Sequence, residues 1–204
     1  DTLTPEVINL SKHIIKYFSE VFPAVPYPYD YMTVFNGSGG MEFSMMVNQD
    51  TENDRWLTTY VTTHEIAHMY FPFLTGTNEK RFSWLDEGMA VYLPLSEQTN
   101  IFPGLKYDEI SAANLSRNMG TQSDVPLMVP STFVYGPAHM MGAYSKSGIA
   151  FLILEDIIGK DAMRTALQTF IKTWTHKHPT PYDFFFSINK STGKNLDWFW
   201  KPWF

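Results

Sequence analysis

His64-Glu65-Ile66-Ala67-His68 is the stretch that decides the fold of this chain, and it lies inside a segment, 55–71, without glycine or proline. Such a segment favours one uninterrupted helix. On a helix, residues four positions apart lie on the same face, with their Cβ atoms about 5–6 Å apart. Two histidines at this spacing can bind one tetrahedral zinc ion, at about 2.0–2.1 Å from each nitrogen. The stretch therefore predicts that His64 and His68 are metal ligands on one helix face.

Glu65 follows His64 directly and is therefore rotated from it by about 100° around the helix. This rotation places the carboxylate beside the metal, where zinc hydrolases hold a base for the attacking water. The alternative is a solvated glutamate between two hydrogen-bonded histidines of an amphipathic helix. We favour zinc, with Glu65 as a catalytic base, because the rest of the chain supplies further parts of such a site.

The stretch Trp84-Leu85-Asp86-Glu87-Gly88 offers a third ligand. Eighteen residues separate His68 from Glu87, and the proline, glycine and asparagine among them favour a loop that lets the next helix fold back. Two imidazoles and one carboxylate leave the fourth position of zinc open for water and substrate, which is the catalytic arrangement. Asp86 is a rival ligand, because spacing alone does not distinguish it from Glu87. The interpretation without a metal is an acidic residue favoured in the first helical turn by the helix dipole.

The composition excludes several classes of protein. The chain has 204 residues and no cysteine, so it has no disulfide framework, and any metal must be bound by His, Asp or Glu. Fifteen Lys and Arg against 21 Asp and Glu give a net charge of −6, which argues against nucleic acid or anionic lipid as a partner. The apolar run 149–154 is too short to span a membrane. No targeting segment is evident, so we expect a soluble protein and assign no compartment.

Hydrophobic periodicity predicts a small β-sheet followed by many helices. A helix is expected over 5–21, then strands over 31–35 and 41–47, joined into a pair by the glycine-rich turn 36–40. Further helices are expected over 53–70, from 83 to a break at 94, and over 107–118, 138–158 and 161–175, with two short aromatic-rich ones in 181–204. This is an α+β fold in which helices dominate. We expect one domain over 1–204, with a helix and small sheet in 1–50 and a mostly helical, zinc-binding part in 51–204.

In its combination of motifs the chain resembles the gluzincin metallopeptidases of the aminopeptidase N family, which also contains the leukotriene hydrolase. The zinc pair, the eighteen-residue spacing and the W-L-x-E-G context of Glu87 match that family. Upstream, the Gly-Gly-Met-Glu-Phe stretch at 39–43 is similar to its G-x-M-E-N element, and Tyr144-Ser145-Lys146 is similar to its Y-x-K-G element. The resemblance implies a thermolysin-like catalytic domain that binds one Zn²⁺ and acts as an aminopeptidase.

The resemblance also implies that Glu42 binds the free α-amine of a peptide substrate. A carboxylate on a strand edge pairs well with an ammonium group, while backbone groups of Gly39 and Gly40 hydrogen-bond the extended peptide. Met41 is expected to shape the pocket for the first side chain. An amine anchor this close to the metal leaves room for one residue before the scissile bond, as in an exopeptidase. The alternative for Glu42 is a surface carboxylate on a strand.

Tyr144 is the position at which the resemblance implies a phenol that donates a hydrogen bond to the oxyanion of the tetrahedral intermediate. Such a donor typically lowers the barrier by about 3–4 kcal/mol. A core tyrosine is a serious alternative, because the chain has 11 Tyr. Tyr135 also lies near a glycine, but only Tyr144 is followed by x-Lys.

Four positions depart from the family pattern. Phe43 replaces an asparagine, which brings the element closer to the G-G-x-E-H of glycyl aminopeptidases, and Ser147 replaces a glycine. Asp86 replaces the usual asparagine. Pro94 stands where the family often has a glutamate that orients a zinc histidine, so the hydrogen bonds behind the ligands must be completed differently.

We therefore expect a zinc-dependent aminopeptidase whose partners are peptides with a free N-terminus. The alternatives are a gluzincin with endopeptidase or glycyl-aminopeptidase preference, and a non-catalytic interaction module stabilised by zinc. Family members carry further domains around the catalytic one, so we expect that neighbouring domains of a longer parent chain are missing here. The aromatic tail 198–204 is expected to pack on the chain's own core or to dock such a neighbour.

Overall fold

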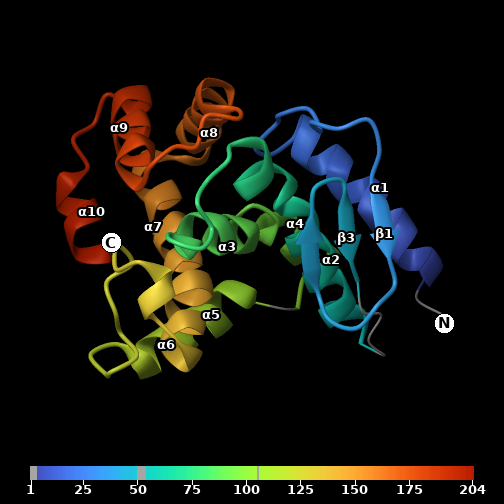
Figure 1. The fold of residues 1–204 in the computed structure, drawn as a ribbon, viewed down its shortest axis with the longest axis horizontal. Coiled ribbons are helices and arrows are strands. Elements are labelled where there is room, and N and C mark those ends of the chain that lie inside the picture. Colours follow the sequence, from blue (N-terminus) through green and yellow to red (C-terminus); the bar gives the residue numbers. More distant parts are fainter. Residues whose placement is uncertain (1–3, 50–53, 105) are drawn as a thin grey trace.

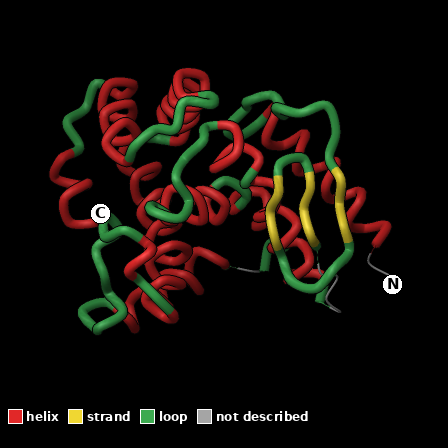
Figure 2. The backbone as a smooth tube through the Cα atoms, viewed as in Figure 1, coloured by secondary structure: helices red, strands yellow, loops and turns green. Residues whose placement is uncertain are grey.

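The computed structural model describes residues 4–49, 54–104 and 106–204, and it places a small three-stranded sheet beside a larger group of helices (Figures 1 and 2). This is the α+β arrangement that the sequence predicts. The first elements are α1 (Thr4–Glu20), β1 (Thr33–Phe35), β2 (Met41–Phe43) and β3 (Met46–Asn48). The others are α2 (Arg55–Ala67), η1 (Met69–Leu74), α3 (Ser83–Tyr92), α4 (Leu95–Ile101), α5 (Tyr107–Asn118), η2 (Ser131–Phe133), α6 (Gly136–Met140), η3 (Met141–Lys146), α7 (Ser147–Ile158), α8 (Lys160–Trp174), α9 (Pro181–Thr192) and α10 (Asp197–Trp203). Within the described ranges, no helix is both long and apolar enough to cross a membrane.

Helix α1 packs against α2 through the apolar face that its sequence predicts. Val7, Ile14 and Phe18 follow helical spacing and are buried. Helix α2 in turn contacts β2 and β3. The helix that carries the zinc motif therefore lies between α1 and the sheet on one side and α3 on the other.

The sheet differs from the predicted pair of strands. The segment 41–47 divides at Ser44-Met45 into two strands, and Met45 adopts a φ of 63° at this tight turn. The order is β1-β3-β2, with β3 parallel to β1 and antiparallel to β2. The glycine-rich segment thus carries the chain past β3 to the far edge of the sheet, and Asn48 Nδ2 in β3 donates to the Ser38 carbonyl at 2.9 Å. As a result β2 is an edge strand, next to the helical part of the molecule (Figure 1).

Helix α2 ends three residues before the predicted limit. Asp54 caps its start by accepting hydrogen bonds from the Trp56 and Leu57 amides, whereas the predicted start at Asn53 lies outside the described residues. After His68 the chain forms the π-helical turn η1, in which Phe71 has φ −135° and ψ 111°. Phe71 precedes Pro72, and proline has no amide hydrogen with which to continue the helical hydrogen bonds. The helix therefore breaks before the proline and not at it.

The later helices follow the sequence closely, with one local difference. Helix α5 has the predicted bounds, and the chain breaks at Pro94 between α3 and α4 as expected. The predicted helix 138–158 is divided into α6, the π-helical turn η3 and α7. Gly159, with φ 93°, ends α7. The π-helical turn contains Tyr144, the residue predicted to be the oxyanion donor.

The aromatic tail packs on the chain's own core. Phe184, Phe199 and Trp200 are buried, and the rings of Phe204 and Trp84 lie 4.5 Å apart between centroids. This confirms the first of the two interpretations of the tail. The contact also fixes α3, because Trp84 belongs to that helix and its ring contacts α7 and α9 as well.

Phe184 and Phe186 of α9 form a matched pair for testing this core. Phe184 is fully buried against Phe151, Phe170 and Trp84, whereas Phe186 is 65% exposed. We expect Phe184→Ala to lower the free energy of unfolding by about 3–5 kcal/mol, because it leaves a cavity. Phe186→Ala should change it by about 0.5 kcal/mol or less. Urea unfolding of both variants is the measurement, and equal effects would contradict the packing.

Candidate active site

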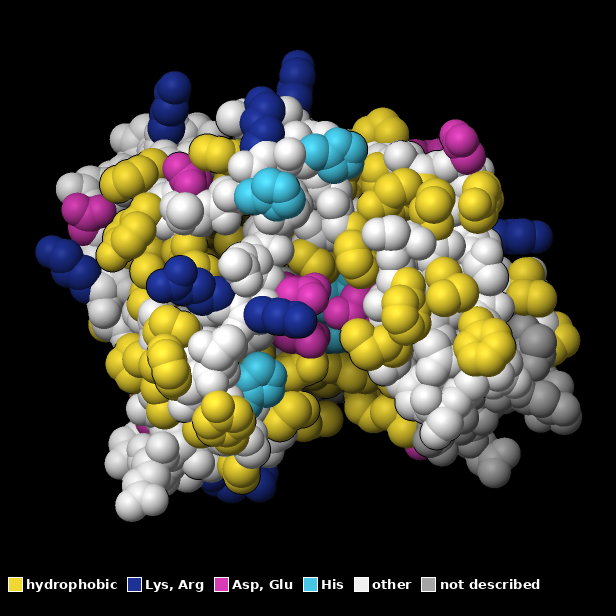
Figure 3. Space-filling model, in the orientation of Figure 1, with side chains coloured by type: hydrophobic (Ala, Val, Ile, Leu, Met, Phe, Trp, Pro, Cys, Tyr) yellow, Lys and Arg dark blue, Asp and Glu magenta, His cyan; other side chains and the backbone are white. Residues whose placement is uncertain are grey.

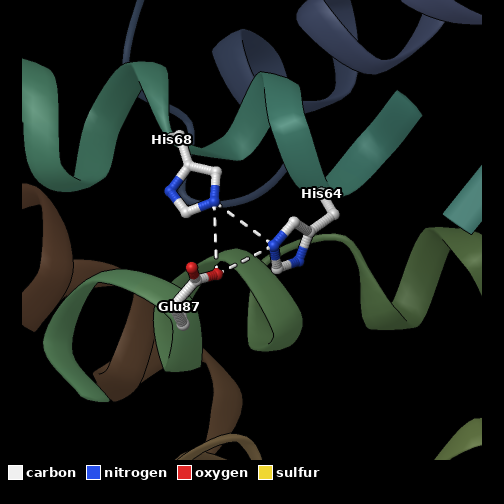
Figure 4. Close-up of side chains that lie close together, drawn as sticks. All are labelled: His64, His68 and Glu87. Atoms are coloured by element: carbon white, nitrogen blue, oxygen red, sulfur yellow. Dashed lines mark hydrogen bonds and ion pairs between the residues drawn. The ribbon is translucent and has the colours of Figure 1, made fainter. Parts of the chain in front are cut away.

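Two imidazoles and one carboxylate converge across the contact between α2 and α3 (Figure 4). Nε2 of His64 lies 3.0 Å from Oε2 of Glu87 and 3.2 Å from Nε2 of His68, and the third distance, from His68 Nε2 to Glu87 Oε2, is 3.5 Å. Two ligand atoms on one tetrahedral zinc ion are about 3.3 Å apart, since each is about 2.0–2.1 Å from the metal. The three atoms therefore already have the spacing of zinc ligands, and this donor set fits that metal.

The electrostatics of the three residues point to a missing positive charge. Burial lowers the pKa of His64. Burial alone would also lower the pKa of His68, which is 1% exposed. The carboxylates of Asp86 and Glu87 outweigh burial at His68 and raise its pKa well above the ordinary value. Burial would raise the pKa of Glu87, but its hydrogen bonds with His64 and His68 hold that pKa far below the usual range. A proton on His68 thus supplies charge that a divalent cation would supply in its place.

Asp86, the rival ligand, faces away from this centre. Its Oδ1 lies 2.6 Å from Nδ1 of His68, and the carbonyl oxygen of Phe71 lies 3.0 Å from the same nitrogen. Both are acceptors, so Nδ1 carries the hydrogen and Nε2 is left to face the metal position. Asp86 thus orients His68. In the family this task often belongs to a glutamate at the position of Pro94, which cannot perform it. Burial raises the pKa of Asp86 to about 7, against the opposing charge of His68.

Stacking holds the other histidine. The ring of His64 lies between those of Tyr60 and Tyr144, at centroid distances of 5.7 and 5.9 Å. Tyr60 stacks on Tyr107 of α5, whose hydroxyl donates to the Tyr60 hydroxyl at 3.0 Å. Tyr60 and Tyr107 are not among the site residues that the sequence motifs predict. The position of Tyr60, four residues before His64 on the same helix face, was the available signal.

The side chain of Glu65 lies between its own helix, α2, and the glycine segment that leads into β2. A side chain at Gly40 would collide with the Glu65 carboxylate and with Val61, so only glycine lets the backbone come this close. Burial raises the pKa of Glu65 to about 8, with neighbouring carboxylates adding to the effect and His68 opposing it. The carboxyl group is thus placed beside the three converging residues and is shielded from water, as expected for a base.

Tyr144 reaches the same centre from η3. Its hydroxyl donates a hydrogen bond to Oε1 of Glu87 at 2.6 Å. The elements approach closely because Gly88 has no side chain; a Cβ at that position would collide with Ser147. Burial raises the pKa of the Tyr144 phenol, and the charge of Glu87 adds to this, so the hydroxyl remains a donor.

Glu42 lies on the His68 side of the centre. One of its carboxylate oxygens is within 4.8 Å of a ring nitrogen of His68 and of a carboxylate oxygen of Asp86. Burial raises the pKa of Glu42. Gly40 and Glu65 line a hollow together with Tyr60, His64, Tyr107 and Tyr144. Figure 3 shows acidic and histidine side chains gathered in a depression at the centre of this face of the molecule. Of the predicted site residues, Gly40, His64, Glu65 and Tyr144 line the hollow, and Glu42, His68 and Glu87 lie close to it, whereas Met41 is 44% exposed.

Comparison with known proteins identifies relatives of this arrangement. The family model for the peptidase family M1 domain matches residues 7–203. Endoplasmic reticulum aminopeptidase 2 of Homo sapiens is 22% identical over 163 residues, which cover 74% of this chain and 16% of that protein. Probable aminopeptidase 2 of Sulfurisphaera tokodaii is 20% identical over 215 residues, which cover 96% of this chain and 28% of that protein. The chain thus spans less than a third of the length of these relatives.

Solved structures share the fold. An M1 zinc metallopeptidase from Deinococcus radiodurans superposes with a TM-score of 0.74 at 20% identity, over 95% of this chain and 43% of that one. A mutant of the same protein bound to a Tyr-Ser-Ala substrate gives a TM-score of 0.73, also at 20% identity, over 94% of this chain and 42% of that one. At such identities the similarity establishes a common fold.

The geometry predicts one zinc ion per chain. We expect His68→Ala and Glu87→Ala to abolish stoichiometric zinc binding, since each removes one of the three ligands. Asp86→Asn should keep the stoichiometry and weaken the affinity by about 10- to 100-fold, because it acts only through His68. Metal analysis and competition with a chelator measure both quantities. His176→Ala, at an exposed histidine, is the control, and unchanged zinc binding by Glu87→Ala would contradict the assignment.

Proposed function

The chain belongs to peptidase family M1, and on this basis we propose that it is the catalytic domain of a zinc-dependent aminopeptidase. The observation that carries the proposal is the convergence of His64, His68 and Glu87, with Glu65 buried beside them. The proposal includes the predicted organisation, one catalytic domain over 1–204 with a sheet-bearing part in 1–50 and a helical part in 51–204. It also includes neighbouring domains in a longer parent chain, because the relatives are several times longer.

His64, His68 and Glu87 would hold the zinc ion, whose chemistry is Lewis acidity that polarises the scissile carbonyl and lowers the pKa of water. Glu65 then takes a proton from the attacking water and passes it to the leaving amine. The position of its carboxyl group supports this role, since Glu65 is buried and lines the same hollow as His64 and Tyr144. A zinc site that only stabilises the fold has no need of a base there.

Tyr144 donates a hydrogen bond from its phenolic hydroxyl to the carbonyl oxygen of the substrate, which becomes negatively charged as the carbonyl is attacked. In this structure the Tyr144 hydroxyl donates a hydrogen bond to Glu87 and is therefore already directed at the three proposed metal ligands. Such a donor lowers the barrier only if it is aimed at the developing charge before the reaction begins. The stack of Tyr144 on the His64 ring supports this orientation.

Glu42 anchors the N-terminus of the substrate. Its carboxylate is half-buried and close to His68 and Asp86, so a peptide ammonium group placed there would neutralise excess negative charge. Backbone groups at Gly39 and Gly40 and the free edge of β2 would hydrogen-bond the peptide, with Met41 beside the first side chain. The rest of the peptide would then lie along the hollow that Gly40, Tyr60 and Tyr107 line.

The base is tested by Glu65→Gln. We expect kcat for an aminoacyl anilide to fall by about 100- to 10,000-fold while zinc content stays at one ion per chain, because Gln has the same shape but cannot accept the proton. Glu109→Gln, at an exposed glutamate of α5, is the matched control and should keep full activity. Full activity in Glu65→Gln would exclude this mechanism, and inactivity of the unaltered, zinc-loaded protein would favour the non-catalytic module.

The amine anchor is tested by comparing free and N-acetylated versions of one substrate. We expect the acetylated substrate to resist cleavage, and Glu42→Gln to raise KM for the free substrate by about 10- to 100-fold, which is the loss of one charged hydrogen bond. Rates are measured with both substrates on both proteins. Equal cleavage of the two by the unaltered protein would support the endopeptidase alternative, and a panel of first residues would reveal a glycyl preference.

A further inference from the structure

An ion pair behind η3 plays no part in the chemistry described so far. Nζ of Lys146 donates to Oδ1 of Asp124 at 2.8 Å and to the carbonyl oxygen of Val125 at 3.4 Å. The Lys146 side chain is only 12% exposed and that of Asp124 only 22%. An ion pair on an open surface contributes little, because water and salt screen it, but this pair is largely shielded. Removing one partner would leave a shielded charge unpaired.

Asp124 is itself held firmly by its own loop. Its Oδ2 accepts a hydrogen bond from the Gly120 amide at 3.0 Å, and its own amide donates to the Thr121 carbonyl at 3.1 Å. These bonds close a compact turn directly after α5. The Lys146 ammonium and the Gly120 amide together hold the pKa of Asp124 below its ordinary value. Lys146 therefore binds a carboxylate that is already oriented.

Lys146 lies two positions after Tyr144 in the same π-helical turn, so the two side chains leave the turn on roughly opposite sides. Tyr144 is directed into the cleft toward Glu87, and Lys146 is directed back toward the loop. Ser147, which follows, lies against Gly88 of α3. The turn also packs on α5, because Met141 is buried against Leu115. Among these contacts, the ion pair is a polar one that lies outside the reacting groups and their helices.

We propose that Lys146 and Asp124 are positioning residues that hold η3 so that the Tyr144 hydroxyl stays aimed at the metal-binding centre. The inference rests on the proposed function, because it takes Tyr144 as the oxyanion donor. A π-helical turn holds one residue more than an α-helical turn. Without the tie to Asp124, η3 loses a contact that opposes relaxation toward α-helical geometry. Loss of the extra residue of the turn would shift side chains around the helix axis by up to one residue step, about 100°, and move the hydroxyl away from its target.

A double-mutant cycle tests whether Lys146 acts through Tyr144. We expect Lys146→Met to lower kcat by about 10- to 100-fold with KM and zinc content unchanged, because only the transition state uses the oxyanion donor. Lys146→Arg should retain most of the activity, and Lys172→Met, at an exposed lysine of α8, should retain all of it. In the Tyr144→Phe background, Lys146→Met should cost nothing further. Losses that multiply in the double variant, or an unchanged kcat in Lys146→Met, would overturn the proposal.

A second measurement does not depend on turnover. With 3-fluorotyrosine at position 144, we expect a single narrow ¹⁹F resonance in the unaltered protein and in Lys146→Arg, and a broadened or divided resonance in Lys146→Met. Asp124→Asn provides an independent break of the same pair if Lys146→Met fails to fold. An identical resonance with and without the ion pair would overturn the inference. An inactive unaltered protein would contradict the proposed function, while the resonance would still decide the role of the pair.

Discussion

The contact between α2 and α3 places two imidazole nitrogens and one carboxylate oxygen within 3.5 Å of one another in a buried position, and the rest of the molecule is arranged around this constraint. Burying such groups is unfavourable unless charge is balanced. Here the balance is kept by a shift of protons, since His68 holds its proton tightly and Glu87 stays ionised. A divalent cation satisfies all three groups at once. The aromatic core around Trp84 supports the arrangement, because it fixes α3 in position.

Local signals in the sequence identified the helices well, whereas the partners of short strands could not be read from it. The bounds of α5 and the break at Pro94 follow from periodicity and from proline, which act on neighbouring residues. The position of β3 between β1 and β2 depends on contacts between residues distant in sequence, and no local pattern records it. The end of α2 is an intermediate case, because Pro72 predicts that the helix stops before it, whereas the π-helical turn that begins at Met69 has no local signal in the sequence.

The candidate site shows the same limit. The spacing of His64 and His68 fixes their common face, and the structure brings the two rings together. Asp86 and Glu87 are neighbours on one helix, so only the packing of α3 decides that Glu87 faces the histidines and that Asp86 stands behind His68. The stack of Tyr60 and Tyr107 and the ion pair of Lys146 join residues more than twenty positions apart. Such pairs depend on the three-dimensional fold and have no local signal in the sequence.

The contact of Gly40 with Glu65 has a geometric consequence. Because nothing larger than hydrogen fits between Gly40 and the side chains of Glu65 and Val61, the backbone leading to Glu42 lies close to the helix of the metal ligands. The separation between the amine anchor and the base is therefore limited by the contact of the glycine backbone with these two side chains. If these residues have the proposed roles, the distance between Glu42 and the metal-binding centre corresponds to one amino acid. The position of cleavage, counted from the substrate's N-terminus, is then determined by the fold before a peptide binds.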